Sequence, residues 1–198
     1  MPRIAGQIDE RKSEAILEAA TALFAEKGIA ASMEEIARRA GVSKQTLYNR
    51  YASKVDIGRA LAERRSDLIT APLRSGADPE TVLTALATAM LEKVFGVAAG
   101  DSLRGVALMA PQAPDLAEAV YHSGPGESLR RLALWLTDQD RAGTLRVPDP
   151  DLAAEMFTGL AVGYGHLRLF MGVTGPPVGD IPRRAREASQ RFLKAFAA

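Results

Sequence analysis

A short polar stretch, residues 43–49, carries the side chains best suited to binding another molecule. Amides, hydroxyls, a phenol and an ammonium group stand close together there, on Ser43, Lys44, Gln45, Thr46, Tyr48 and Asn49. Glutamine and asparagine amides can hydrogen-bond to the edge of an adenine base, whereas lysine, serine and threonine contact phosphate oxygens. Double-stranded DNA presents both kinds of group, so this stretch predicts DNA binding.

These side chains act together only if a helix holds them on one face. On a wheel of 100° per residue, Leu47 and Tyr51 lie together and face the core, which turns Gln45, Thr46 and Asn49 outward. Lys44 and Tyr48 flank that outward face. Ser43 is a good N-cap residue, and the N–H groups that follow it suit a phosphate. A helix of about two turns fits a major groove roughly 12 Å wide.

A second short helix is expected just before this one. Ser32 and Glu35 form a capping-box pattern that begins a helix, and Gly41 ends it because glycine adopts a left-handed backbone without steric cost. Short helices joined by a turn that contains glycine are typical of a helix-turn-helix. The apolar residues that would hold the pair together are Ile36, Ala40, Val42 and Leu47.

Positive charge is concentrated in the same region. The whole chain carries a net charge of +1, but residues 38–65 hold eight basic residues against Asp56 and Glu63, which gives +6. Such a stretch favours an anionic partner. Two alternatives stay open: an ordinary solvated face with Arg50 in it, or a three-helix unit that binds nothing, with Tyr48 packed on the next helix.

The residues around this stretch resemble the tetracycline-repressor (TetR) family of bacterial regulators. The resemblance rests on ILEAATALFAEKG at 16–28, on MEEIARRAGVSKQTLYNRYASK at 33–54 and on the helix that follows. It implies that Lys44, Gln45, Thr46, Tyr48 and Asn49 face DNA, and that Ser32, Ser43, Tyr48 and Lys54 contact phosphates. Asn49 and Arg50 depart from the usual aromatic or histidine residues, so the operator sequence cannot be transferred from a relative.

The rest of the chain predicts more helices and no strand. Asp78-Pro79 and Asp149-Pro150 each place a capping acid before a proline at the first helical position. The expected helices cover 79–98, 101–110, 114–122, 126–142, 150–171 and 181–197. The fold class is all-α, with a helix-turn-helix domain at 1–54, a connecting helix at 55–72, and a ligand-binding and dimerisation domain at 73–198.

The second domain is expected to bind a small apolar effector and to form a homodimer. Methionine and aromatic side chains suit irregular apolar ligands, and the candidate pocket residues are Met90, Phe95, Met109, Tyr121, His122, Leu132, Trp135 and Met156. The resemblance implies that 150–171 and 181–197 pair with their twofold mates. The candidate dimer residues are Leu160, Gly163, Leu167, Phe170 and Phe192. The alternatives are that the pocket candidates are ordinary core, that His122 is structural or exposed, and that the small residues of the dimer helices serve internal packing.

Other classes of protein have little support. The chain has no cysteine, and His122 and His166 lack metal-ligand spacing, so no catalytic residue, metal or cofactor is expected. No apolar run is long enough for a membrane span, and the N-terminus does not read as a signal peptide, so the cytoplasm is the expected location. The prediction is a repressor that binds a palindromic operator as a homodimer and is released by an effector. The alternatives are a DNA-binding protein without an effector, or an activator.

Overall fold

The computed structural model describes residues 5–95, 105–108, 110–171, 173 and 179–198, with side chains from residue 10 onward. Within these ranges the chain is helical and has no named strand, which confirms the all-α prediction. An isolated antiparallel bridge joins Leu145 to Ala197. None of the described helices is both long and apolar enough to cross a membrane. The chain divides into two compact units, one of Met1–Arg64 with Gly105–Ser123 and the other of Arg65–Arg104 with Gly124–Ala198.

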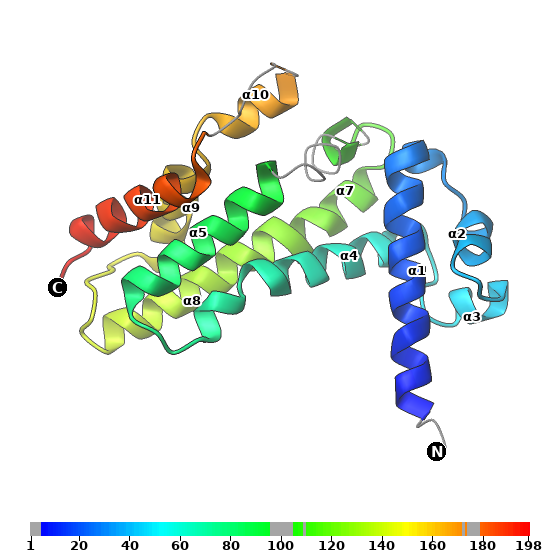
Figure 1. Ribbon diagram of the computed structural model, residues 1–198, viewed down its shortest axis with the longest axis horizontal. Coiled ribbons are helices and arrows are strands. Elements are labelled where there is room, and N and C mark those ends of the chain that lie inside the picture. The colour runs from blue at the N-terminus through cyan, green and yellow to red at the C-terminus, as the bar shows by residue number, and fades with distance from the viewer. Residues whose placement is uncertain (1–4, 96–104, 109, 172, 174–178) are drawn as a thin grey trace. The chain divides into compact units, whose positions relative to one another are not determined.

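The first unit contains the helices predicted around the polar stretch, together with α7, which the sequence analysis assigned to the second domain (Figure 1). They are α1 (Ala5–Lys27), the 3-10 turn η1 (Gly28–Ala30), α2 (Met33–Arg39), α3 (Lys44–Tyr48), the start of α4 (Lys54–Ile69) and α7 (Pro114–Tyr121). Its core is apolar and fully enclosed, with Ile16, Ile36, Leu47 and Ile57 each 0% exposed. Burying such side chains contributes about 1.5–3 kcal/mol each, which fixes the short helices α2 and α3.

Helix α7 packs on α4 inside the first unit. Gly58 has no side chain, and this lets Leu116 of α7 approach the α4 backbone closely. Leu116 is 6% exposed as a result. A segment that is distant in sequence therefore completes the unit that holds α2 and α3.

The second unit is built from the remaining helices. They are the end of α4, η2 (Ala71–Arg74), α5 (Pro79–Phe95), α8 (Glu127–Arg141), α9 (Pro150–Val162), α10 (Gly165–Met171) and α11 (Ile181–Ala195). The π-helical turn η3 (His122–Gly126) precedes α8 in the chain. Helix α5 packs against α11, and α8 packs against α9. Phe157 and Phe192 meet edge to face in the core, with ring centroids 5.2 Å apart.

The local signals at helix starts are confirmed. The carboxylate of Asp149 accepts a hydrogen bond from the N–H of Leu152 at 3.0 Å, and Asp78 accepts one from Thr81 at 3.0 Å. Each acid thereby satisfies an N–H group that the helix itself leaves unpaired. The predicted residues 96–98, 101–104 and 109 lie outside the described ranges.

The single helix predicted over 150–171 is wrong, because the chain breaks at Gly163. This residue has φ +55° and ψ −146°, outside the helical region. The guanidinium of Arg184 lies against it and donates hydrogen bonds to the carbonyl oxygens of Ala161 and, at 3.3 Å, of Leu160. Arg184 thus satisfies the last carbonyl groups of α9, and α10 begins anew at Gly165.

Candidate nucleic-acid interface

Helices α2 and α3 are held in a defined geometry by their caps and by the turn between them. The Ser32 hydroxyl accepts from the N–H of Glu35 at 3.2 Å, while the Ser32 N–H donates to the Glu35 carboxylate at 2.9 Å. Gly41 adopts φ +65° in the turn, as predicted. Ser43 then begins α3 by accepting from the N–H of Thr46 at 3.1 Å. The two helices form the helix-turn-helix that the sequence predicts.

The polar face of α3 points away from the core. Leu47 is fully buried and Tyr51 half-buried, which anchors one side of the helix. The opposite side is exposed at Lys44, Gln45, Tyr48 and Asn49, with Thr46 half-buried. Tyr48 keeps 43% of its surface exposed and is not enclosed by α4. The helical wheel therefore predicted the outward set correctly.

The outward side chains are hydrogen-bonded to one another. The Gln45 amide donates to the Asn49 side-chain oxygen at 2.7 Å, and the Ser43 and Thr46 hydroxyls lie 2.8 Å apart. The Lys44 ammonium is 3.3 Å from a carboxylate oxygen of Glu34 on α2. These contacts hold the polar groups in preferred positions, and each can be exchanged for a contact with a ligand because the groups are exposed.

Ser32 and Lys54 have structural partners. The Lys54 ammonium donates to the carbonyl of Ile29 at 2.6 Å and is half-buried. That carbonyl belongs to η1, so the bond ties the start of α4 to the turn before α2. The Ser32 hydroxyl is held by Glu35 within the capping box. The Lys54 ammonium and the Ser32 hydroxyl would therefore have to contact phosphate while they also make these structural hydrogen bonds.

Acidic residues of α1 pair with two of the eight basic residues of the stretch. Arg39 makes a bidentate contact with Glu26 at 2.6 and 2.9 Å. Arg64 pairs with Glu14 at 2.5 Å. Both acids lie outside the +6 segment in sequence, so counting charge along the chain overstated the local excess. No spacing rule would have revealed these partners, because they come from a different helix.

Glu35 joins α2 to the end of α1. Its carboxylate is 2.5 Å from the Lys27 ammonium and also accepts from Ser32. The hydrogen bond from Lys27, followed by those from Ser32, lowers the pKa of Glu35 to about 2. The carboxylate is therefore charged at neutral pH, and α2 is bound to α1 at its first turn.

The candidate pocket residues lie in different environments. Leu132 is buried, and Met90, Phe95 and Trp135 pack half-buried against the core. Met156 is 50% exposed on the outer face of α9, so it does not line an interior cavity. The remaining candidates are elsewhere: Tyr121 and His122 are exposed and Tyr121 ends α7 in the first unit, while Met109 lies outside the described residues.

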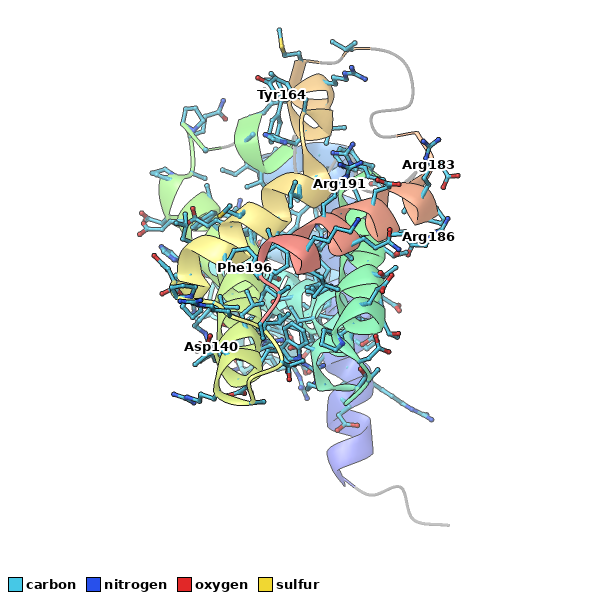
Figure 2. All side chains as sticks on the ribbon, turned by 90° about the vertical axis from the view of Figure 1, so that its left-hand side faces the viewer. Asp140, Tyr164, Arg183, Arg186, Arg191 and Phe196 are labelled. Carbon is cyan, nitrogen blue, oxygen red and sulfur yellow. The ribbon has the colours of Figure 1, made fainter. Side chains whose placement is uncertain are left out.

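A surface pocket of about 420 Å³ lies instead along α11. Its lining is Leu160, Asp180, Arg183, Arg184, Glu187, Ala188 and Arg191. Figure 2 shows Arg183, Arg186 and Arg191 along this charged helix. The lining is largely charged and differs from the methionine and aromatic set that the sequence suggested.

Three of the five candidate dimer residues are exposed apolar side chains, on α9 and α10. Leu160, Leu167 and Phe170 are 43%, 44% and 37% exposed. On α9, Leu160 forms an exposed apolar stripe with Leu152 and Met156, which stand at helical spacing from it. Phe192 is 1% exposed inside the core, so its assignment to a dimer surface is corrected. Gly163 forms the break between α9 and α10.

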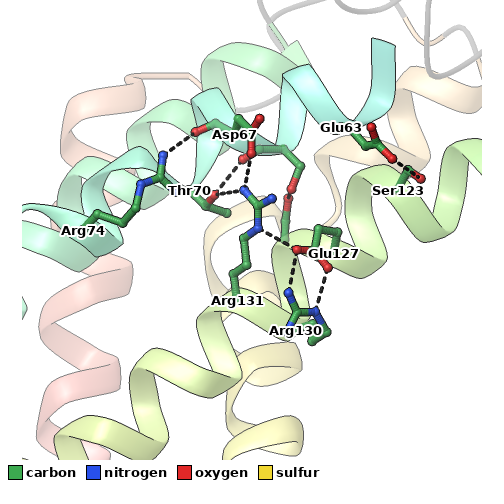
Figure 3. Close-up of polar contacts among 10 residues, drawn as sticks. Glu63, Asp67, Thr70, Arg74, Ser123, Glu127, Arg130 and Arg131 are labelled. Atoms are coloured by element: carbon green, nitrogen blue, oxygen red, sulfur yellow. Dashed lines mark hydrogen bonds and ion pairs between the residues drawn. The ribbon is translucent and has the colours of Figure 1, made fainter. Parts of the chain in front are cut away.

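The end of α4 is fixed to α8 by a polar network in the second unit (Figure 3). Arg131 donates to Asp67 at 2.6 Å and to Thr70 at 3.0 Å, and also to Glu127 at 2.7 Å. The Ser66 and Ser128 hydroxyls lie 2.9 Å apart. Ser66 and Thr70 are 0% exposed, so a shift of this end of α4 against α8 would break partly buried hydrogen bonds.

Models of known protein families match both halves of the chain. A family model described as bacterial regulatory proteins, tetR family, matches residues 16–61. Another, described as the C-terminal domain of AefR-like transcriptional repressors, matches residues 81–198. The transcriptional activator FasR of Mycolicibacterium smegmatis is 35% identical over 95 residues, which cover 48% of this chain and 43% of FasR. The chain thus aligns with less than half the length of the curated relatives it matches.

Solved structures agree over nearly the whole chain. A TetR-family regulator from Mesorhizobium loti MAFF303099 has a TM-score of 0.78 at 26% identity, covering 96% of this chain and 98% of that one. The flavonoid-responsive regulator FrrA has a TM-score of 0.70 at 30% identity, covering 95% and 98%. With a helix-turn-helix that exposes its polar face, one family match that spans it and another over residues 81–198, the chain belongs to the TetR family of bacterial transcriptional regulators.

Proposed function

We propose that this regulator is a ligand-responsive repressor that binds a palindromic DNA operator as a homodimer. The observation that carries the proposal is the exposed face of α3, whose amide and hydroxyl groups stand on a helix anchored by buried Leu47. Gln45 and Asn49 read base edges in the major groove, and Lys44, Ser43 and Thr46 contact phosphates. The match to the C-terminal domain of AefR-like repressors favours repression.

Tyr48, Ser32 and Lys54 are assigned to the phosphate backbone beside the groove. Tyr48 is exposed and free to turn its hydroxyl outward. Ser32 stands at the N-terminus of α2 and Lys54 at that of α4, where backbone N–H groups favour an anion. Such contacts fix the register of the helix on DNA without distinguishing sequences.

The proposed dimer uses the apolar stripe of α9 together with Leu167 and Phe170 of α10. Leu152, Met156 and Leu160 recur every four residues, so they lie on one face of α9. Large apolar side chains gathered on one exposed face mark an interaction site more often than scattered ones do. In two copies related by a twofold axis, the α3 helices would bind DNA half-sites that lie about one turn of the DNA helix apart or somewhat more.

The proposed effector is a small, largely apolar molecule that enters the second unit near Met90, Phe95 and Trp135. FrrA responds to a flavonoid, which supports this class of effector by analogy. The effector acts by favouring an arrangement of α4 in which the two α3 helices of the dimer cannot both enter successive major grooves of the DNA. Typical coupling of this kind is about 1–3 kcal/mol, or roughly 5–150-fold in operator affinity.

The test starts with selection of bound sites from a random DNA library, using the full-length protein. Inverted repeats among the selected sites are expected, whereas sites without twofold symmetry would contradict the homodimer. The selected operator is then titrated with a panel of apolar compounds while affinity is measured by fluorescence anisotropy. If no compound changes the affinity, the alternative of a DNA-binding protein without an effector is preferred.

Activation is the second candidate function, and the identity to the activator FasR is the observation that favours it. A reporter gene placed behind the selected operator distinguishes the two. Repression predicts higher expression when the protein is deleted, and activation predicts lower expression.

A further inference from the structure

Glu34 is an acidic side chain in contact with the DNA-facing helix. It stands in the first turn of α2, and its carboxylate oxygen is 3.3 Å from the ammonium of Lys44, the first residue of α3. The two side chains are 49% and 66% exposed. A pair so open to water is readily exchanged for another partner.

The neighbouring acids have different partners. Glu35 is held by Lys27 and the capping box, and Glu26 is held by Arg39. These contacts join α2 to α1 and need not open when α3 meets DNA. Glu34, by contrast, pairs with a cation of α3 itself. Its pKa is lowered by a backbone hydrogen bond within its own helix turn and by Lys44, so it is charged at neutral pH.

We propose that Glu34 competes with DNA phosphates for Lys44 and thereby weakens binding to duplexes of every sequence by a similar factor. The proposal rests on the proposed function. When a phosphate takes Lys44, the pair with Glu34 opens and a carboxylate is left close to another anion. Both effects oppose binding, and neither depends on the bases. Glu34 therefore lowers affinity for the operator and for other DNA alike.

The experiment compares Glu34→Gln with the unaltered protein on the selected operator and on a scrambled duplex, across a range of salt concentrations. An exposed pair is worth about 0.2–1 kcal/mol, so we expect affinity for both duplexes to rise about 1.4- to 5-fold. The logarithmic salt dependence should steepen by up to about 0.9, because Lys44 gains a full phosphate contact. An acid in the first turn stabilises its helix, so the substitution cannot raise affinity by strengthening the fold.

Glu18→Gln is the matched control, since it makes the same charge change on an exposed position of α1. Lys44→Met supplies the second control, because the effect of Glu34→Gln should vanish when Lys44 is absent. Equal gains from Glu18→Gln and Glu34→Gln would assign the effect to net charge and overturn the proposal. A gain that persists without Lys44 would overturn it as well.

The remaining outcomes separate this proposal from the function on which it rests. If Glu34→Gln changed the preference at one base pair, Glu34 would be a base-reading residue that accepts from cytosine, and the competition would be refuted. If the unaltered protein bound DNA and the variant bound it equally well, only the role of Glu34 would fail. If the unaltered protein bound no duplex, the proposed function itself would fail.

Discussion

Gln45 and Asn49 lie one turn apart on α3 and are joined by a hydrogen bond of 2.7 Å from the Gln45 amide nitrogen to the Asn49 side-chain oxygen. Each amide therefore orients the other before DNA arrives. We expect Gln45→Ala and Asn49→Ala each to relax base preference at particular positions, at a cost of about 1–3 kcal/mol for the preferred site. Because the two side chains are in contact, the double variant should lose less than the sum. Repeating the site selection with each variant measures this, and unchanged preferences would contradict it.

Lys54 should behave differently from the amides. Lys54→Met removes a proposed phosphate contact, so it should weaken binding to all duplexes alike and flatten the logarithmic salt dependence by about 0.9. It also removes the charged hydrogen bond to Ile29, which should reduce the free energy of unfolding by about 1.5–3 kcal/mol. Titrations of operator and scrambled duplex give the first quantity and urea unfolding gives the second. A loss of stability with an unchanged salt slope would leave Lys54 with the structural role alone.

Glu127 should make stability depend on pH. The hydrogen bond from Arg130, the largest cause, and that from Arg131 lower the pKa of Glu127 to about 2 from the ordinary 4.5. A lowered pKa means that the ionised carboxylate is preferred in the folded state, so its contribution is complete above about pH 4.5 and is lost as the pH falls towards 2. Glu127→Gln should therefore be less stable than the unaltered protein at pH 7. The gap should narrow between pH 4.5 and 2.

Urea unfolding of both proteins at several pH values measures that gap. Glu187→Gln is a suitable comparison, because Glu187 pairs with Arg191 on the exposed face of α11. An exposed pair contributes only about 0–1 kcal/mol. A gap for Glu127→Gln that stayed constant with pH would contradict the role of its charge.

The stripe on α9 predicts the effect of a charge at Leu160. Leu160→Glu should weaken the proposed homodimer by about 2 kcal/mol or more, because a carboxylate at the centre of an apolar interface loses its water. Leu134→Glu is the matched control, since Leu134 is 53% exposed on α8, away from the stripe. Light scattering over a range of protein concentrations should reveal monomers only for Leu160→Glu. Identical behaviour of the two variants would contradict the interface.

The break at Gly163 predicts opposite effects for two glycines of one region. Gly163→Ala forces a side chain into a backbone conformation that other residues rarely adopt and against Arg184, so it should cost about 1–3 kcal/mol. Gly159→Ala adds a methyl group where nothing lies within 4 Å, inside α9. It should be neutral or should stabilise the protein by up to about 1 kcal/mol. Thermal unfolding of both variants measures this difference in stability. An equal loss of stability in the two variants would contradict the prediction.

What the sequence could predict was governed by short-range interactions. The caps at Ser32, Ser43 and Asp149 and the turn at Gly41 depend on neighbours within four residues, so their patterns are readable in the chain. The outward face of α3 follows from one apolar pair. These features were predicted correctly for physical reasons that act within a single turn.

The features that escaped prediction arise between distant segments. Glu26 meets Arg39 across 13 residues, and Arg184 meets Ala161 across 23, so no local pattern marks either contact. Gly163 was assigned to the dimer surface, and only its backbone angles and the guanidinium beside it show that the helix ends there. Phe192 was assigned to a surface because apolar residues on a helix do not reveal which face the core covers.

The close approach of Leu116 to Gly58 affects whether the DNA-binding part can be transferred to another protein. Residues 1–64 alone would leave the surface around Gly58 bare, because the segment that covers it comes from residues 105–123. Such a fragment would expose apolar atoms of α4 to water, and α4 would lose the helix that packs against it. A graft of this DNA-binding part onto another protein should therefore include α7. The transferred part then consists of two segments that are not contiguous in the sequence.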